Sequence, residues 1–181
     1  MKLLHQTVPP KWVFAAILFT VLALTFRVRD VLASNQEAEA EHLLVHAHTA
    51  YTAGDYAEAL RIAEDAVAEA PNSALVLVKA SDYAFVLGMS RYERAEYWHM
   101  EAFEAGLHYS TRAHRIDPED AEVHRAWAEG LLFAYLYEYP VSTDEVRESW
   151  NALPVASQAD RAYRDTALRI INNGKATAGK R

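Results

Sequence analysis

The residues of this chain with the clearest capacity for chemistry are three neighbouring histidines. His42 and His46 lie four residues apart, so on a helix their imidazole rings share one face, as two ligands of a metal ion do. His48 points to a different face, because residues two apart on a helix do not meet. Two histidines without a third fixed ligand are typical of an ordinary helix surface, so we expect no metal and no cofactor. A metal protein or enzyme built on His42 and His46 remains an alternative hypothesis.

The motifs of the common catalytic mechanisms are missing from the sequence. It contains no glycine-rich phosphate loop and no nucleophile elbow, and it has no cysteine. The lack of cysteine also excludes disulfides, thiolate metal sites and a lipid-modified N-terminal cysteine. The acids Asp117, Glu119 and Asp120 precede a predicted helix, whose N-terminus carboxylates stabilise. We therefore interpret these acids as caps and expect a protein that is not an enzyme.

The composition indicates a folded, all-α protein. Of its 181 residues 51% are hydrophobic and 24% charged, and glycine and proline number only six each. The formal net charge is −7; residues 1–33 hold four Lys or Arg and one acid, which leaves 14 basic and 24 acidic residues in the rest. Such an acidic domain repels phosphate backbones, so we expect no nucleic acid as a partner.

An uncharged segment near the N-terminus predicts contact with a membrane. It runs from Trp12 to Phe26, with Lys11 before it and Arg27 and Arg29 after it. Its fifteen residues make roughly 22 Å of helix, short of a bilayer core of about 30 Å unless the flanking arginines snorkel. The residues expected to contact lipid are Trp12, Phe14, Ile17, Leu18, Leu22 and Phe26.

This segment is compatible with an uncleaved anchor or a signal peptide. Val31, Leu32 and Ala33 have the spacing of a cleavage site, yet the charged residues from Arg27 to Asp30 fit poorly between a hydrophobic region and its cleavage point. We favour a single-pass anchor with the N-terminus inside, which in a bacterium places the domain in the periplasm. The flanking charges are nearly balanced, so the opposite orientation stays open.

A 34-residue unit follows the anchor. Residues 40–73, AEHLLVHAHTAYTAGDYAEALRIAEDAVAEAPNS, have the spacing of helix, turn and helix. The ending recurs at residues 113–120, AHRIDPED, but this second unit carries about 13 extra residues around positions 89–101. A third first helix starts at Ala121 and is broken by Pro140; helical spacing returns at 144–153 and 156–171, and Asn172, Asn173 and Gly174 predict a stop.

The unit resembles the tetratricopeptide repeat (TPR). On the TPR pattern Ala47, Ala59 and Ala66 are the small residues where helices cross, Gly54 makes the turn, and Pro71 closes the repeat. The resemblance covers residues 40–140. It implies an all-α solenoid of helical hairpins with about three repeats, the second expanded and the third degenerate, preceded by one transmembrane or signal-anchor helix.

The expanded second unit also resembles the TatT-like TPR proteins associated with TRAP transporters. The residues concerned are Tyr83, Ala84, Phe85, Arg94, Ala95, Glu104, Ala105, Gly106, Tyr109 and Ala113. Those proteins are periplasmic lipoproteins, so the resemblance implies a ligand-binding role in an apolar cavity lined by rings such as Phe85 and Phe133. The lipid-bearing cysteine is missing here, and a helix would have to replace it.

The TPR register implies a concave partner-binding groove. It assigns to the groove Glu41, Leu44, His48, Tyr51, Leu75, Val78, Asp82, Phe85, Glu122, Arg125, Glu129 and Leu132, and it turns His46 toward the core. This mixed apolar and acidic lining favours a helix or extended peptide with apolar anchors and some basic residues. Tyr92, Tyr97 and Trp98 of the expansion form a second candidate protein interface.

These observations predict four segments and one main function. Residues 1–33 are the anchor or signal peptide, 34–39 a linker, 40–172 the helical domain and 173–181 a flexible tail. The main hypothesis is a membrane-anchored scaffold or accessory subunit, whose partners are the membrane and other proteins of a membrane complex. The alternative is a periplasmic ligand-binding protein of the TRAP-associated kind.

Overall fold

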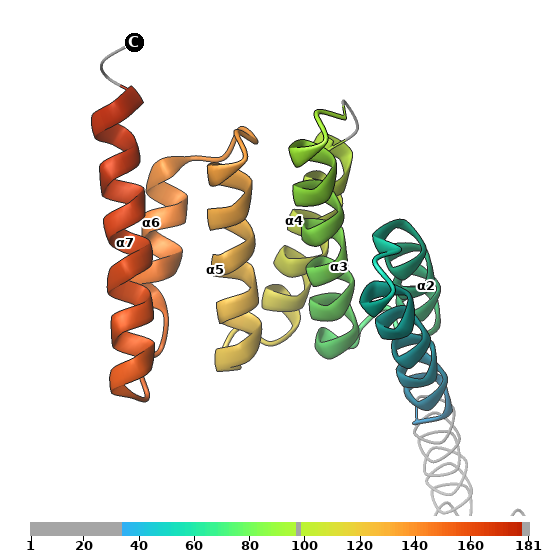
Figure 1. Ribbon diagram of the computed structural model, residues 1–181. Coiled ribbons are helices and arrows are strands. Elements are labelled where there is room, and N and C mark those ends of the chain that lie inside the picture. The colour runs from blue at the N-terminus through green and yellow to red at the C-terminus, as the bar shows by residue number, and fades with distance from the viewer. Residues whose placement is uncertain (1–33, 97–98, 179–181) are drawn as a thin grey trace, which may run out of the picture.

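The computed structural model describes residues 34–96 and 99–178, and within this part of the chain every regular element is a helix. The helices are residues 34–52, α2 (Tyr56–Glu69), α3 (Ala74–Glu93), α4 (His99–Ile116), α5 (Ala121–Leu136), α6 (Thr143–Ala152) and α7 (Gln158–Ala178). Figure 1 shows them following one another across the molecule in chain order, with α7 at one end and α2 at the other. The predicted all-α class is confirmed for these residues.

The first helix pair is held by alanines and a glycine turn. Ala47 on the helix of residues 34–52 and Ala59, Ala63 and Ala66 on α2 are fully buried in one core cluster, because methyl side chains let two backbones approach closely. Gly54 has a φ of 83°, which glycine adopts without strain. The backbone N–H of Glu58 then donates to the carboxylate of Asp55, which caps α2.

The extra residues of the second unit lengthen its helices. α3 has 20 residues and α4 has 18, against 14 in α2. α3 is central: it contacts α2, α4 and α5, and ten of its residues are buried on several sides. The hydroxyl of Ser81 donates to the carbonyl of Gly106 at 2.9 Å, a buried bond that draws the middle of α3 against α4.

The ring of Phe85 lies where α3, α4 and α5 meet. A Cβ atom added to Gly106 on α4 would lie 2.9 Å from the Phe85 ring, and one added to Gly130 on α5 would lie 2.6 Å from it. The ring therefore occupies the space that side chains at both glycines would take. Phe103 and Phe133 pack around it with ring centroids 6.2 Å away, an aromatic contact distance.

The C-terminal helices form a second core against α5. The indole N–H of Trp150 donates to the carbonyl of Ala128 at 2.9 Å, and Trp150 is fully buried. Ala167 and Ile171 of α7 pack into the same cluster. At the start of α5 the carboxylate of Asp120 accepts hydrogen bonds from the backbone N–H groups of Glu122 and Val123. Asp120 therefore caps the helix, as its position in the sequence predicts.

Two predicted boundaries differ from the structure. Residues 34–39, predicted as a linker, are helical and continuous with the first repeat helix, because SNQEAE contains no glycine or proline to interrupt it. Helix α7 continues through Gly174 to Ala178 instead of stopping at residue 172; a single glycine costs a helix only about 1 kcal/mol.

The predicted membrane segment cannot be placed in this fold. Residues 1–33, with Trp12, Phe14, Ile17, Leu18, Leu22 and Phe26, lie outside the described residues. Among the helices that the structure does describe, none is both long enough and apolar enough to cross a membrane.

Replacing Gly130 by alanine tests the packing of Phe85. The new methyl group would overlap a ring that Gly106 confines from the other side, so we expect a loss of about 1–2 kcal/mol in the free energy of unfolding despite the better helix propensity of alanine. Urea unfolding of the full chain measures it. In a Phe85→Leu background the same change should cost less, and an equal cost in both backgrounds would contradict the contact.

Candidate binding groove

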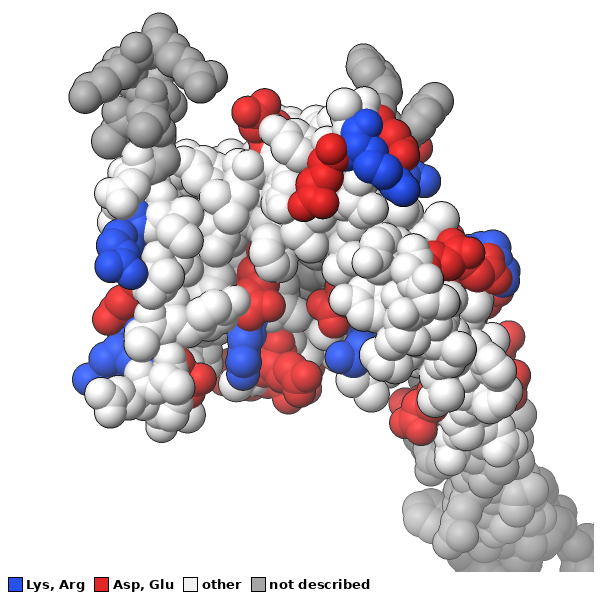
Figure 2. Space-filling view, in the orientation of Figure 1, with Lys and Arg blue, Asp and Glu red and all other residues white. Residues whose placement is uncertain are grey.

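A groove of about 770 Å³ opens between the helix of residues 34–52, α3 and α5. Its lining is mainly apolar, and Figure 2 shows the surface hollowed there, with acidic atoms along the edges. The lining residues are Leu44, Val45, His48, Thr49, Tyr51, Leu75, Lys79, Asp82, Tyr83, Phe85, Val86, Met89, Ala126, Glu129, Gly130 and Phe133. This volume is in the range of ligand sites in proteins.

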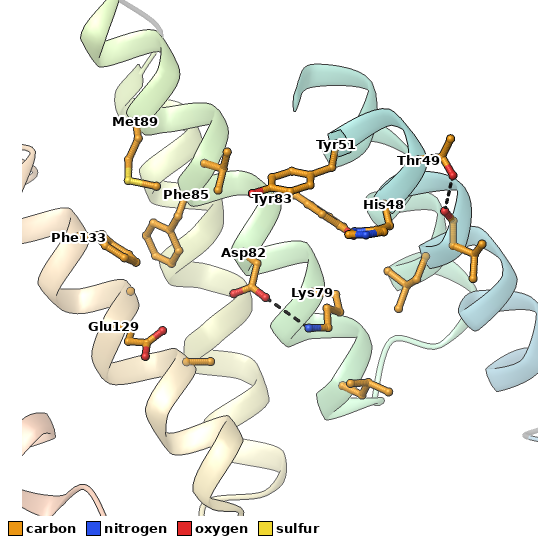
Figure 3. A pocket seen from close by; sticks show the side chains of 16 residues that line it. His48, Thr49, Tyr51, Lys79, Asp82, Tyr83, Phe85, Met89, Glu129 and Phe133 are labelled. Carbon is orange, nitrogen blue, oxygen red and sulfur yellow. Dashed lines mark hydrogen bonds and ion pairs between the residues drawn. The ribbon is translucent and has the colours of Figure 1, made fainter. Parts of the chain in front are cut away.

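The apolar lining has a deep end and an exposed mouth. Phe85, Phe133 and Met89 gather at one end of the groove in Figure 3, over the place where α3 and α5 pack around Phe85. Val45 and Leu75 are 65% and 48% exposed. Large apolar side chains left this open in a concave surface mark it as a contact surface for another molecule.

Carboxylates enter the groove from two of its three helices, α3 and α5. Asp82 on α3 and Glu129 on α5 project into the space between the two helices (Figure 3). The ammonium group of Lys79 lies 3.7 Å from the Asp82 carboxylate, and both side chains are close to half exposed. An exposed pair at this distance is weak, so Asp82 is only loosely neutralised.

Partial desolvation in the groove raises the pKa of Asp82 to about 6, although about half of its side chain remains exposed. Lys79 opposes this rise, while the carboxylates of Glu129 and Glu122 across the groove add to it. Both acids of α5 are therefore near enough to repel a charge on Asp82. At neutral pH the groove therefore contains a carboxylate whose charged form is less stable than it would be in water.

The pKa of Glu129 is also raised, and its carboxylate is hydrogen-bonded to the last helix, α7. Burial raises its pKa, although the Tyr163 hydroxyl, which donates to its carboxylate at 3.1 Å, and Arg125 both oppose the rise. The pKa of Tyr163 is raised to about 12, first by burial and then by Glu129. The hydrogen bond links α7 to the groove wall on α5 and orients the Glu129 carboxylate.

Most of the residues assigned to the groove from sequence line it. Leu44, His48, Tyr51, Leu75, Asp82, Phe85 and Glu129 do so. Val78 and Leu132 do not: both are buried in core clusters. Glu41, Glu122 and Arg125 are exposed on the same helices but outside the lining.

The two misassigned residues are each next in sequence to a residue that does line the groove. On α3 the stripe facing the groove is Leu75, Lys79, Asp82, Val86 and Met89, so Lys79 takes the place given to Val78. On α5 the groove is lined by Ala126, Glu129, Gly130 and Phe133. Ala126 and Phe133 take the places given to Arg125 and Leu132. One residue is about 100° of helix rotation, enough to turn a side chain from groove to core.

Phe133, which the second resemblance placed with Phe85 in an apolar cavity, lines the groove beside it. The lining residues that were not assigned from sequence are Val45, Thr49, Lys79, Tyr83, Val86, Met89, Ala126 and Gly130. The three-and-four spacing from Leu75 to Met89 is visible in the sequence and could have found the α3 stripe. No sequence pattern indicates that Gly130 lies beside Phe85.

The rings of His42 and His46 meet, but His48 does not join them. The Nε2 atoms of His42 and His46 are 3.4 Å apart on the exposed face of their helix, so His46 does not point into the core as the register implied. His48 stacks on Tyr51 on the groove side. Over the described ranges no group of three or more His, Cys, Asp or Glu side chains could hold a metal ion.

The second candidate interface is described only in part. Tyr92, at the end of α3, is 38% exposed and packs edge-on against His99 and Tyr137. Tyr97 and Trp98 lie outside the described residues. Tyr92 thus joins the expansion to the end of α5 while leaving part of its ring open.

The fold and the groove define an all-helical protein with a concave, mostly apolar groove that contains carboxylates. No protein-family model matches the chain, and a search of curated proteins finds no significant match.

Replacing Asp82 by asparagine tests the cost of its charge. Its pKa is higher in the folded chain than in the unfolded one, so the folded state binds more protons and loses stability as pH rises from 4 to about 6. We expect Asp82→Asn to raise the free energy of unfolding at pH 7 by about 1 kcal/mol, a value reduced for solvent screening, and to raise it less near pH 4. Urea titrations at both pH values measure the difference.

The matched control is Glu148→Gln on the exposed face of α6, which removes one carboxylate outside the groove. It should leave stability nearly unchanged at both pH values. A destabilised Asp82→Asn at pH 7 would contradict the raised pKa.

Proposed function

We propose that this chain is a membrane-anchored TPR-type protein that holds a segment of a partner protein in its groove, as a non-enzymatic scaffold or as an accessory or assembly subunit of a membrane complex. The observation that carries the proposal is the groove of about 770 Å³ with its exposed apolar mouth. A helical scaffold with an open apolar groove is a common receptor for peptide segments of other proteins.

The TPR assignment is supported by small residues at the helix contacts and by the conformation of the turn. Ala47, Ala59 and Ala66 are buried at helix contacts, and Gly54 has the left-handed backbone of the turn. The helix pairs follow one another in series (Figure 1). The groove lies on the helix of residues 34–52, α3 and α5, which are the first helices of the three proposed repeats.

The membrane anchor is supported by the uncharged stretch Trp12–Phe26 and its basic flanks. In this proposal residues 1–33 fix the chain in a bacterial inner membrane and the acidic helical domain faces the periplasm. An anchor keeps the groove near membrane partners, which raises their effective concentration.

A second candidate function is a periplasmic ligand-binding protein of the TRAP-associated kind. The observation that favours it is the groove end lined by Phe85, Phe133 and Met89, since aromatic and apolar side chains typically line small-molecule sites. The exposed Val45 and Leu75 favour the protein partner, because a small ligand at the deep end leaves them uncovered.

A Leu75→Glu variant tests the main proposal. Leu75 lies in the first turn of α3, where an acid is tolerated, so the fold should persist while the groove mouth becomes charged. In mild-detergent pull-downs of the full-length chain from its native membranes, we expect the variant to retain less than about a tenth of the companion protein, a loss of at least 1.4 kcal/mol. Mass spectrometry of the companions and of the bait's N-terminus gives the readout.

Ile170→Glu on α7 is the matched control, since Ile170 is 40% exposed and outside the groove. It should retain the companions. A bait that begins at Ser34 and is recovered alone would contradict the anchored scaffold and leave the ligand-binding function as the better proposal.

A further inference from the structure

The groove combines features that together select the chemistry of its occupant. It has an apolar end, an apolar mouth, two carboxylates on opposite walls and one weakly paired lysine. Charges that face a groove without strong partners recognise the opposite charge on a ligand. The occupant must therefore supply apolar side chains and a cation at a fixed distance from them.

The carboxylates lie between the two apolar parts. Along α3 the stripe runs from Leu75 at the mouth through Asp82 to Met89 at the deep end. Met89 lies fourteen residues after Leu75 on the same helix, a distance of about 21 Å at 1.5 Å per residue. A partner helix of about four turns laid along the stripe would cover both apolar parts and bring its middle to Asp82 and Glu129.

The position between Asp82 and Glu129 is suited to a positive group. The two carboxylates interact across the groove, since Glu129 contributes to the raised pKa of Asp82. Lys79 approaches Asp82 only to 3.7 Å, and Glu129 is bound by a neutral hydroxyl of Tyr163. Arg125 on α5 also acts on Glu129, but its side chain lies outside the groove lining. A second cation between the two acids would relieve their repulsion.

We infer that the groove binds an amphipathic helix of a partner protein through a lysine or arginine that sits between Asp82 and Glu129 and displaces Lys79, with apolar side chains of the same helix on either side. This inference rests on the proposed function and names the chemistry of the partner. His48 and Thr49 on the helix of residues 34–52 add polar contacts. Spacings of three or four residues between the basic and apolar side chains of the ligand would place them on one face.

Lys79 gives the inference a signature that a structural role would not produce. Because its ammonium group lies 3.7 Å from the Asp82 carboxylate, removal of Lys79 should favour an incoming cation, whereas removal of either carboxylate should oppose it. Lys79→Met keeps the apolar stem and removes the charge. The two kinds of variant therefore shift binding in opposite directions.

The test uses the full-length chain in mild detergent and a library of random sixteen-residue peptides. Peptides that the wild-type chain retains are sequenced, labelled and titrated by fluorescence anisotropy. We expect a lysine or arginine three or four positions from large apolar residues. Replacing that residue by norleucine, or using Asp82→Asn or Glu129→Gln, should weaken binding about five- to tenfold, and Lys79→Met should tighten it. Glu148→Gln is the matched control and should leave the affinity unchanged.

Three results would overturn the inference. The first is that the selected peptides contain no basic residue. The second is that Asp82→Asn and Glu129→Gln leave the affinities unchanged. The third is that Leu75→Glu weakens the binding of none of the recovered peptides. If the native companion is lost with Leu75→Glu but unaffected by both carboxamide variants, the inference fails while the proposed function stands. If Leu75→Glu also leaves the companion bound, both fail.

Discussion

The contact on which this structure depends is the ring of Phe85 held between two glycines. α4 and α5 each approach α3 as closely as an aromatic ring permits, because Gly106 and Gly130 have no side chains in the way. The hydroxyl of Ser81 fixes α4 in the same place, one turn earlier on α3. The turn of α3 that bears Phe85 also bears Asp82 and Val86, so the ring determines how the groove wall faces α5. The Phe85 ring thus belongs both to the packing of the three helices and to the groove lining.

The electrostatics of the groove follow from this packing. Bringing α5 against α3 places Glu129 and Glu122 close enough to Asp82 to raise its pKa. The chain partly compensates: Lys79 lies beside Asp82, and the Tyr163 hydroxyl of α7 and the charge of Arg125 act on Glu129. The contact with Lys79 is long and exposed, and the donor on Tyr163 is neutral. The charged forms of both acids are therefore disfavoured by burial and only partly stabilised by these neighbours.

The sequence predicts the local features of this fold well and its long-range features poorly. Gly54, Asp120 and the small residues Ala47 and Ala59 have roles that depend on neighbours in the chain, and the structure gives each the expected place. Val78 and Leu132 are misassigned because each lies one residue, about 100° of helix, from a residue that lines the groove. Which of two neighbouring residues faces the groove depends on contacts between distant residues. No local pattern shows that Gly130 faces Phe85, so the contact between α3 and α5 beside the groove could not be derived from sequence.

The two candidate roles make different demands on the carboxylates. An entirely apolar ligand in the groove would exclude water from Asp82 and Glu129 without strengthening the weak contacts that they make with Lys79 and Tyr163, and removing water from a poorly paired charge is costly. The charged form of Asp82 is already disfavoured by burial, so such a ligand would raise its pKa further. A ligand with one cation avoids that penalty and gains an attraction that strengthens as water leaves. The groove is therefore better suited to an amphipathic basic helix than to a neutral apolar molecule, and the reason lies in the charges that the Phe85 packing brings together.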